Sequence, residues 1–380
     1  MTSLRLAIFY AMAFGFIGVL MPFWPLWLKS RGLTAEDIGL VMALGIAVKT
    51  VGNPLVANTA DRMGERKRIM AVLALFACIV FAAYQWTYGF WAILAVTLLF
   101  HALWSPAMPL METLVMQTGK LEPIDYGRVR LWGSVTFIFG AWGMGYVLND
   151  SPIDTVYWVA LALMAATFAS TLTLPDTRIA PSAGKRRPIA AVLTDRTFIL
   201  FAVGAALIQS SHGVYYTFGT IHWQSVGHSE AVIGWLWAEG VIAEVILFIW
   251  GDKLVKRFGA ARLIALGGLA GLVRWAGTGL TDALPALMVL QVLHAFTFGA
   301  AHLGAIHFIA RRMAPEISAT AQSLYAGLVM GLAMGMSAWM SGKLYAAHAA
   351  QSYFAMAVMA GLGGIIAFAL RRRHATGESP

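Results

Sequence analysis

The 380-residue sequence has little charge and almost no cysteine. Only 12% of its residues are Asp, Glu, Lys or Arg, about half the share found in soluble globular domains, whereas 59% are hydrophobic. The one cysteine, Cys78, excludes an intramolecular disulfide and any cysteine-based metal motif. This composition excludes an ordinary soluble enzyme and indicates a chain that lies almost wholly in a lipid bilayer.

Apolar runs recur along the whole chain, and each is long enough to cross the hydrocarbon core as a helix. The first follows Arg5 and stays apolar and aromatic through Trp27, which is too long for the core of a signal peptide, so we expect it to be retained. The sequence therefore predicts an all-α membrane protein with twelve transmembrane helices. The runs are 5–29, 37–59, 68–86, 90–116, 129–149, 154–174, 197–221, 231–252, 262–280, 284–310, 319–343 and 351–370.

Basic residues gather on one side of the predicted membrane. With the N-terminus inside, most of the 27 Lys and Arg residues fall in cytoplasmic segments, and few, such as Lys29, Arg31 and Lys343, fall on the opposite side. This asymmetry is the positive-inside pattern, and it predicts a multi-pass protein of the inner (plasma) membrane with both termini in the cytoplasm. Because the bilayer accounts for the net charge of +9, no nucleic acid partner is expected.

One polar stretch divides the chain in two. It contains Pro175, Pro181 and the basic run from Lys185, a composition typical of an exposed linker. The halves also resemble one another, since Gly32 and Arg62 recur with the same offset as Gly227 and Arg257. Paired six-helix repeats with a substrate site where they meet are typical of major facilitator transporters. We predict an N-terminal six-helix bundle over 1–175, a cytoplasmic linker over 176–195, a C-terminal six-helix bundle over 196–372 and a cytoplasmic tail over 373–380.

A short motif follows the second predicted span. Its residues Asp61, Arg62, Gly64, Arg66 and Lys67 resemble the loop signature G-x-x-x-D-R-x-G-R-K that lies between helices 2 and 3 in the major facilitator superfamily. In this sequence an alanine replaces the first glycine of that signature, and a glutamate replaces its first basic residue. The resemblance implies a role in conformational gating. The plainer interpretation is a basic cytoplasmic loop with a turn glycine.

Ionisable residues stand in the middle of several spans. A charge at that depth costs roughly 2.5–3.5 kcal/mol on insertion scales, so each such residue is a functional candidate. Because a guanidinium stays charged, Arg274 needs a carboxylate or water, and we expect Glu244 as its partner and His294 as the third member of a proton relay. For any single histidine, the alternative is a contact with a neighbouring carbonyl group. The candidates are Lys49, Glu112, Glu239, Glu244 and Arg274, with His101, His212, His294 and His302.

Helical spacing predicts which of these groups share a face. Polar and aromatic residues recur at steps of three and four in three spans, so we expect these stripes to line a pore. Glu239 stands five residues before Glu244 and points elsewhere, which favours Glu244, on the face of Trp237 and Gly240. The stripes are His101, Ser105, Met108 and Glu112; Gln209, His212, Tyr216, Thr220 and Trp223; and Gln291, His294, Phe298 and His302.

Several segments resemble the phenylpropionate permease family of the major facilitator superfamily. The resemblance extends from about Phe23 to Arg312, and more distantly the chain resembles lactose permease and the oligosaccharide:proton symporters. It implies a major facilitator fold of two six-helix bundles. The segments are DYGRVRLWGS at 125–134, WLWAEGVIAEVILF at 235–248, VRW at 273–275 and LHAFTFGAAHLGAIHFIARR at 293–312.

The resemblance also implies roles for single residues at the substrate site. Glu112 and Arg130 match the acid and the arginine that hold the sugar in lactose permease. The tryptophan on which the sugar stacks in that family is Phe137 in this sequence. This departure argues against a galactoside as the substrate.

A second set of implied roles concerns proton coupling. Arg274 and His294 match the arginine and histidine of the coupling cluster in lactose permease. The acid three residues beyond that histidine is Thr297 in this sequence, so the proton carrier must be another group. The spacing argument above makes Glu244 the expected carrier.

Together these features predict a proton-coupled symporter that imports a small aromatic carboxylate, such as 3-phenylpropionate, by alternating access. The sequence has no HExxH, Walker or GxGxxG motif, and no enzymatic activity is expected. The expected partners are the substrate, protons and the bilayer; we expect a monomer and no cofactor or metal. Two alternatives stay open, namely a nucleoside or oligosaccharide:proton symporter and, in another class, a non-transporting membrane receptor.

The expected site residues fall into two groups. An anion in a low-dielectric cavity requires a cation, so Lys49, Arg130 or Arg274 can receive the substrate carboxylate. The predicted substrate contacts are Lys49, Glu112, Arg130, Phe137, His212 and Tyr216, and the predicted proton-coupling residues are Glu244, Arg274, His294 and His302.

Overall fold

The computed structural model describes residues 1–177 and 189–375, with side chains for all of them except residues 315–316 and 371–375. Throughout the described chain, the regular elements are helices, which confirms the predicted all-α fold. The middle of the predicted linker, residues 178–188, and the end of the predicted tail lie outside the described residues.

Eleven helical runs of the described chain are long and apolar enough to cross a membrane. Ten of them begin and end within a few residues of a predicted span. The last, Ile317–Leu370, has 54 residues, about 80 Å of helix at 1.5 Å per residue, and this is too long for one crossing. The helix is interrupted at Ala349, whose φ is +44°. This run therefore supplies two spans, in agreement with the predicted twelve.

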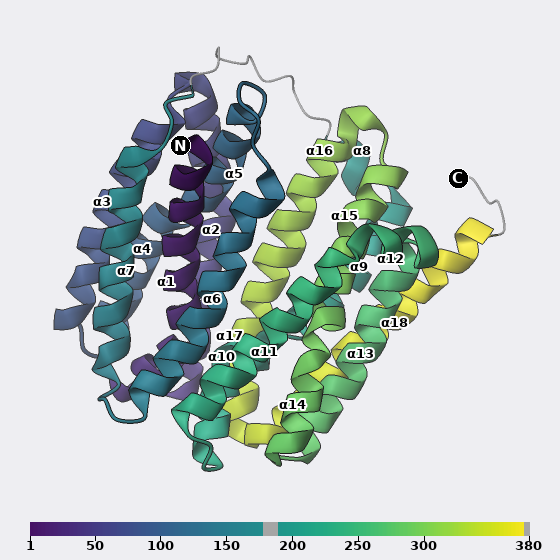
Figure 1. Cartoon of the computed structure of the whole chain (residues 1–380). Coiled ribbons are helices and arrows are strands. Elements are labelled where there is room, and N and C mark those ends of the chain that lie inside the picture. Colours follow the sequence, from purple (N-terminus) through teal and green to yellow (C-terminus); the bar gives the residue numbers. More distant parts are fainter. Residues whose placement is uncertain (178–188, 376–380) are drawn as a thin grey trace. The chain divides into compact units, whose positions relative to one another are not determined.

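The chain divides into two compact units, of which the first comprises Met1–Gly184 and Gly227–Ala238. In this unit α1 packs along α6 and α7 (Figure 1). Its helices are α1 (Thr2–Ser30), α2 (Ala35–Met63), α3 (Arg66–Ala82) with the 3-10 turn η1 (Ala83–Trp86), α4 (Phe90–Trp104), α5 (Ala107–Thr118), α6 (Tyr126–Leu148), α7 (Asp154–Thr173) and the beginning of α11 (Glu230–Ile249).

The second unit comprises Lys185–Val226 and Glu239–Pro380. Here α13 packs along α18 and α15 (Figure 1). Its elements are α8 (Ile189–Leu193), α9 (Arg196–Ser210), α10 (Gly213–Ser225), the rest of α11, α12 (Gly251–Phe258), α13 (Ala260–Leu280), α14 (Leu284–Val292), the π-helical turn η2 (Ala295–Ala300), α15 (Ala301–Arg312), α16 (Pro315–Leu324), the π-helical turn η3 (Tyr325–Ala333), α17 (Met334–His348), the 3-10 turn η4 (Ala349–Gln351) and α18 (Ser352–Ala375).

Local sequence signals set the ends of α2. The Thr34 side chain accepts from the backbone N–H of Asp37, and the Asp37 carboxylate accepts from the backbone N–H of Thr34, which is a complete capping box. At the other end Gly64 has a φ of +70°, a conformation that glycine adopts without a side-chain clash. The helix therefore begins and ends where the sequence supplies these groups.

Close backbone contacts and ring packing hold α1 inside the first unit. A Cβ on Gly18 would lie 2.5 Å from the carbonyl oxygen of Phe137, so only glycine allows α1 to approach α6 this closely. Trp24 and Trp27 stack at a centroid distance of 4.3 Å, and the indole N–H of Trp27 donates to Asp154 at 3.0 Å. Buried indoles with a polar partner stabilise such a packed core.

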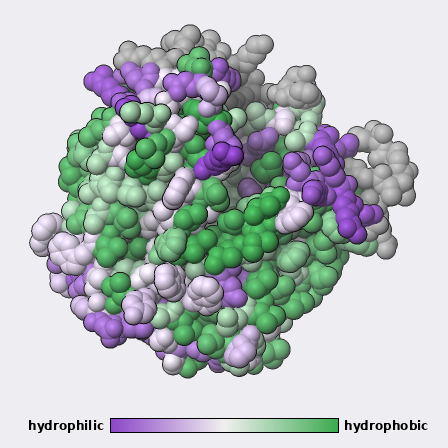
Figure 2. Space-filling view, viewed as in Figure 1, coloured by the Kyte–Doolittle hydropathy of each residue, from purple (hydrophilic) through white to green (hydrophobic). Residues whose placement is uncertain are grey.

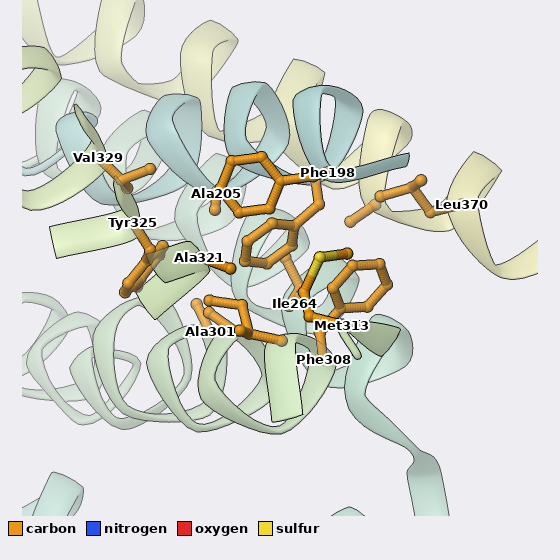
Figure 3. Close-up of a cluster of buried hydrophobic side chains, with 14 of the residues drawn as sticks. Phe198, Ala205, Ile264, Ala301, Phe308, Met313, Ala321, Tyr325, Val329 and Leu370 are labelled. Carbon is orange, nitrogen blue, oxygen red and sulfur yellow. The ribbon is translucent and has the colours of Figure 1, made fainter. Parts of the chain in front are cut away.

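A hydrophobic cluster joins α9, α15 and α18 in the second unit. Figure 3 shows Phe198, Phe308, Met313 and Leu370 gathered in this cluster, with Tyr325 at its edge. All five side chains are buried. The cluster holds Tyr325, the first residue of η3, in place. The Tyr325 hydroxyl also contacts His302, a predicted coupling residue.

Large apolar side chains also remain exposed on both units. Figure 2 shows hydrophobic residues over much of the visible face. Trp91 is 79% exposed and Ile249 is 72% exposed, far more than a water-soluble surface tolerates in such numbers. These helices therefore carry the surface expected of spans that contact lipid acyl chains.

Candidate functional site

In the first unit, Glu112 and Arg130 form an ion pair. Nε of Arg130 lies 3.6 Å from Oε1 of Glu112, and the Tyr126 hydroxyl donates to Oε2 at 2.7 Å. Tyr126 and Arg130 lie one turn apart on α6 because this helix begins directly after Asp125, whose side chain accepts from the backbone N–H of Arg128. The cap therefore sets the register that brings both side chains to one carboxylate.

Two rings of α1 cover the guanidinium of Arg130. Its central carbon lies 4.0 Å from the ring centroid of Phe14 and 5.5 Å from that of Tyr10, which is cation–π geometry. The Arg130 and Glu112 side chains remain 32% and 36% exposed. Because such open pairs contribute less than about 1 kcal/mol to stability, both charged groups can exchange this contact for one with a ligand.

The predicted stripe from His101 to Glu112 does not run along one continuous helix. The helix α4 ends at Trp104 and α5 begins at Ala107, with Pro106 between them. Proline has no backbone N–H and clashes with the preceding turn, so it interrupts the helix. His101 faces Gly45 of α2, whereas Glu112 faces α6.

The predicted substrate contact Lys49 lies on α2 between two contacts with α4. One turn before it, Gly45 admits the ring of His101, since a Cβ there would lie 2.6 Å from Cδ2 of that ring. One turn after it, Oδ1 of Asn53 accepts from the Ser105 hydroxyl at 2.7 Å. Residues three to four apart share a helix face, so Lys49 lies on the face that meets α4.

In the second unit, the guanidinium of Arg274 is completely buried. It donates to Oε1 of Gln291 at 2.6 Å and to Oγ1 of Thr297 at 3.0 Å, and one of its nitrogens lies 2.9 Å from Nδ1 of His294. The ring centroid of Tyr215 lies 4.7 Å from its central carbon. A buried cation is therefore held by neutral polar groups and an aromatic face.

His294 lies between Arg274 and Glu244. Its Nε2 is 3.7 Å from Oε2 of Glu244. We predicted Glu244 as the partner of Arg274 and His294 as the third member, and the structure places His294 beside both groups. A Cβ at Gly240 would lie only 3.3 Å from Cβ of His294. The small residue therefore lets α11 approach His294.

The hydrogen bonds of His294 assign its tautomer. A guanidinium can only donate, so Nδ1 of His294 accepts from Arg274 and carries no proton. The ring proton is then on Nε2, which faces the Glu244 carboxylate. While this arrangement holds, the imidazole is neutral, and the group beside it that can change its charge is Glu244.

His212 joins the same network through Thr297. Its Nδ1 lies 2.9 Å from the carbonyl oxygen of Gln209, so Nδ1 carries the proton and Nε2 accepts from the Thr297 hydroxyl at 3.0 Å. The ring of Tyr216 stacks on His212 with a centroid distance of 5.2 Å. Both ring nitrogens of His212 are therefore occupied, and its face is covered by an aromatic ring.

The predicted coupling residue His302 makes a separate contact. Its Nδ1 lies 3.2 Å from the hydroxyl oxygen of Tyr325, and its ring stacks on Phe298 at 5.8 Å. Tyr325 is the first residue of η3, and Thr297 lies in η2, so both π-helical turns hold a residue that contacts a histidine. π-Helical turns within longer helices are frequent at functional sites.

The loop motif after α2 contains an ion pair between a buried arginine and an exposed aspartate. The guanidinium of Arg66, 5% exposed, donates to Oδ1 of Asp61. Gly64 forms the left-handed turn between them, while Arg62 is exposed and Lys67 is half-buried. The resemblance at this loop therefore coincides with a specific contact between the end of α2 and the start of α3.

The structure adds residues to the predicted set. Phe137, which belongs to that set, is buried and packs its backbone against α1. Tyr126 contacts the first network and received no role beforehand. Gln291 was predicted only as part of a pore-lining stripe and Thr297 was named only as a departure, and both contact Arg274. The spacing of four residues between Tyr126 and Arg130 was a usable signal for the first of them.

Membrane-spanning helices that carry charged groups at depth, arranged in two six-helix units, define a multi-pass membrane transporter. The chain belongs to the MFS_1 like family, whose model matches residues 3–356. It is 35% identical over 350 residues to a protein of Escherichia coli (strain K12) named "Probable 3-phenylpropionic acid transporter", with 90% of each chain covered. These two findings confirm the resemblance to the phenylpropionate permeases.

More distant relatives and solved structures agree with this fold. The maltose permease of Geobacillus stearothermophilus is 24% identical, over 98% of this chain and 95% of that protein. The nucleoside permease NupG of Escherichia coli (strain K12) is 22% identical over 84% of each chain. The crystal structure of nucleoside transporter NupG matches with a TM-score of 0.84 at 17% identity, covering 98% of this chain and 99% of that one. These matches confirm the major facilitator fold.

Proposed function

We propose that this protein is a proton-coupled symporter that imports a small aromatic monocarboxylate, such as 3-phenylpropionate, by alternating access. The observation that carries the proposal is the 35% identity, over 90% of each chain, to a protein named as a probable transporter of 3-phenylpropionic acid. The charged groups of both units are consistent with it, because an organic anion and a proton each need a polar partner at membrane depth.

The proposed substrate contacts combine cations with aromatic surface. Arg130 lies over the rings of Phe14 and Tyr10, so an aromatic acid would meet both charge and ring faces there. In the second unit, the stacked rings of His212 and Tyr216 offer a second aromatic surface. The full proposed set is Lys49, Glu112, Arg130, Phe137, His212 and Tyr216.

The proposed coupling residues are Glu244, Arg274, His294 and His302. The assignment of Glu244 as the proton carrier is supported by the hydrogen bonds of His294, whose Nδ1 is occupied by Arg274. A proton that enters with a monocarboxylate cancels its charge. Import then avoids electrical work of about 2.3 kcal/mol per charge for each 100 mV of inside-negative potential.

The remaining parts of the proposal concern gating and placement. Asp61, Arg62, Gly64, Arg66 and Lys67 would act in conformational gating through the Asp61–Arg66 contact. The basic residues near the span ends favour an inner-membrane location with both termini in the cytoplasm. We propose a monomer built of two six-helix bundles over 1–175 and 196–372.

A second candidate is a nucleoside or oligosaccharide:proton symporter. The Glu112–Arg130 pair favours it, because an open ion pair suits a substrate with several hydroxyl groups. The relatives named maltose permease and nucleoside permease point the same way. A non-transporting membrane receptor remains the alternative of another class.

Transport in proteoliposomes tests the proposal. We would impose an inside-alkaline pH gradient and measure uptake of labelled 3-phenylpropionate, uridine and maltose. The proposal predicts accumulation of the acid alone, and its collapse when a protonophore is added. Accumulation of uridine or maltose instead would establish the second candidate. Binding of a substrate without flux of any would establish a receptor.

A further inference from the structure

We propose that Lys49, with His101 and Asn53, forms the receptor for the carboxylate group of the transported substrate. The inference rests on the proposed function. Of the three cations that could receive the carboxylate, it selects Lys49 over Arg130 and Arg274. The two arginines and Lys49 differ in what already contacts them, and this difference decides between them.

Both arginines are already provided with partners. Arg130 pairs with Glu112, so its charge is balanced within the first unit. Arg274 is completely buried, and both terminal nitrogens of its guanidinium contact Gln291, Thr297 or His294. At Arg130 a substrate carboxylate would only exchange one counter-charge for another, and at Arg274 it would have to reach a guanidinium that is completely buried.

Lys49 has no such partner. Among the side chains that the structure describes, none is hydrogen-bonded or ion-paired to its ammonium group. The side chain is half-buried, so it is shielded from bulk solvent and still accessible. A buried charge without a counter-charge is unfavourable, and a native protein retains one where a ligand supplies the missing charge.

The position of Lys49 excludes a simple surface role. It is near the centre of α2, which extends from Ala35 to Met63. At 1.5 Å per residue each end of the helix is about 21 Å away, beyond the reach of a lysine side chain. Lys49 therefore cannot place its ammonium among lipid headgroups, as lysines near span ends do.

The half of α2 that follows is free of core packing. From Ile46 to Thr59, no residue of this helix is buried in the described unit, whereas Ile38, Val41 and Gly45 are. A helix that leaves its core in this way presents its side chains to another phase or to a ligand. Lys49 stands at the start of this open half.

Its neighbours on α4 and α2 are hydrogen-bond donors. Nδ1 of His101 is buried and has no hydrogen-bond partner among the described residues. The Ser105 hydroxyl occupies Oδ1 of Asn53, so the amide N–H groups of Asn53 remain to donate. The acid that follows on α5, Glu112, faces Arg130 and Tyr126 instead.

These groups fit one class of ligand. An ammonium, an imidazole N–H and an amide N–H can saturate the two oxygens of a carboxylate with charge-assisted hydrogen bonds. A neutral nucleoside or sugar would leave the ammonium uncompensated. The cluster of Lys49, His101 and Asn53 therefore selects a monocarboxylate by its charge.

Binding measurements on the full-length protein in nanodiscs test this inference. Isothermal titration calorimetry would compare 3-phenylpropionate with its neutral analogue 3-phenylpropionamide. We expect Lys49→Gln to weaken acid binding by about tenfold to a hundredfold and to leave amide binding unchanged, because one charge-assisted contact is lost. Lys49→Arg should retain most of the acid affinity. The matched control is Lys29→Gln, at the exposed end of α1.

Thermal unfolding without ligand provides a second readout. Removing an uncompensated charge should raise the unfolding temperature of Lys49→Gln above that of the wild type. If Lys49 only packs against α4, the same variant should unfold at a lower temperature. A lower unfolding temperature together with unchanged acid affinity would overturn the receptor role.

The outcomes separate this inference from the proposed function. If the wild type accumulates 3-phenylpropionate while Lys49→Gln still binds acid over amide, the receptor assignment is wrong and the function stands. If the wild type binds uridine and neither the acid nor the amide, the proposed substrate class itself is wrong.

Discussion

The imidazole of His294 faces the carboxylate of Glu244, with Nε2 and Oε2 3.7 Å apart. The opposite nitrogen of the ring is occupied by Arg274 at 2.9 Å, so the imidazole presents an N–H to the carboxylate. Protonation of Glu244 would remove the negative charge that this N–H faces and weaken the contact. If Glu244 carries the proton as proposed, a change in its charge alters the contact between α11 and His294.

The first prediction concerns this carboxylate. With one proton carried per anion, a pH gradient of one unit drives about tenfold accumulation, because tenfold corresponds to 1.4 kcal/mol. In Glu244→Gln we expect no accumulation, so that the substrate concentration inside equals the concentration outside. Exchange of labelled for unlabelled substrate should continue. Proteoliposomes with and without the pH gradient measure both quantities.

Glu239→Gln is the matched control for this variant. It removes a carboxylate from the same helix five residues earlier, about 140° away around the axis. Gradient-driven accumulation should persist in it. If Glu244→Gln accumulates substrate as well as Glu239→Gln does, Glu244 is not the proton carrier.

The second prediction concerns the hydroxyl that joins Arg274 to His212. Thr297→Val keeps the shape of the side chain and leaves the guanidinium and Nε2 of His212 each without one partner. Buried groups left in this way cost about 1–3 kcal/mol each. We expect the free energy of unfolding to fall by about that amount, as measured by denaturant unfolding in detergent.

Thr278→Val tests whether replacing any buried threonine with valine lowers the free energy of unfolding as much. Thr278 is buried in α13, and its hydroxyl donates to the carbonyl oxygen of Arg274 in its own helix. Such bonds within a helix contribute little to stability. Equal losses in the two variants would mean that Thr297 has no special place in the network.

Helical periodicity predicted shared faces within an uninterrupted helix, but not across Pro106 between α4 and α5. Spacing placed Gly240 and Glu244 on one face of α11, and in the structure both approach the helix that carries His294. The spans were equally predictable, since each needs about 20 apolar residues. Long apolar runs and steps of three or four depend only on the order of residues along one helix.

Contacts between helices were less predictable. The spacing within each helix does not state how closely α11 approaches His294, which depends on Gly240, so the 3.7 Å distance from His294 to Glu244 could not be predicted. The π-helical turn around Thr297 was not predicted either, although His294, Phe298 and His302 still stack along that helix. Whether Lys49 has a counter-charge likewise depends on distances between helices.

The third prediction concerns the loop after α2. In Asp61→Asn the buried guanidinium of Arg66 keeps an acceptor and loses its charge partner. Because asparagine keeps a neutral acceptor and the Asp61 side chain is half exposed, we expect a stability loss of about 1 kcal/mol and slower transport with unchanged substrate affinity. Uptake rates measure the effect on transport, and equilibrium binding measures the substrate affinity.

The exposed pair of Glu65 with Arg68 provides the control for the loop. The two atoms are 3.4 Å apart, and the arginine side chain is largely open to solvent. Because exposed pairs contribute little, Glu65→Gln should leave both transport rate and stability close to those of the wild type. A slower rate in Glu65→Gln alone would contradict the importance of the Asp61–Arg66 contact.

The fourth prediction uses two glycines of α6 that lie two residues apart. A Cβ on Gly145 would lie 2.3 Å from the carbonyl oxygen of Glu230 and 2.9 Å from Cα of Gly234, and neither backbone atom can move aside cheaply. A Cβ on Gly143 would have no heavy atom within 4 Å.

We therefore expect Gly145→Ala to lower the free energy of unfolding by about 1–3 kcal/mol. Gly143→Ala should raise it by about 0.5–1 kcal/mol, since alanine favours the helix. Thermal unfolding of both variants in the same detergent decides the point, and equal effects would show that α6 and α11 do not approach one another at Gly145.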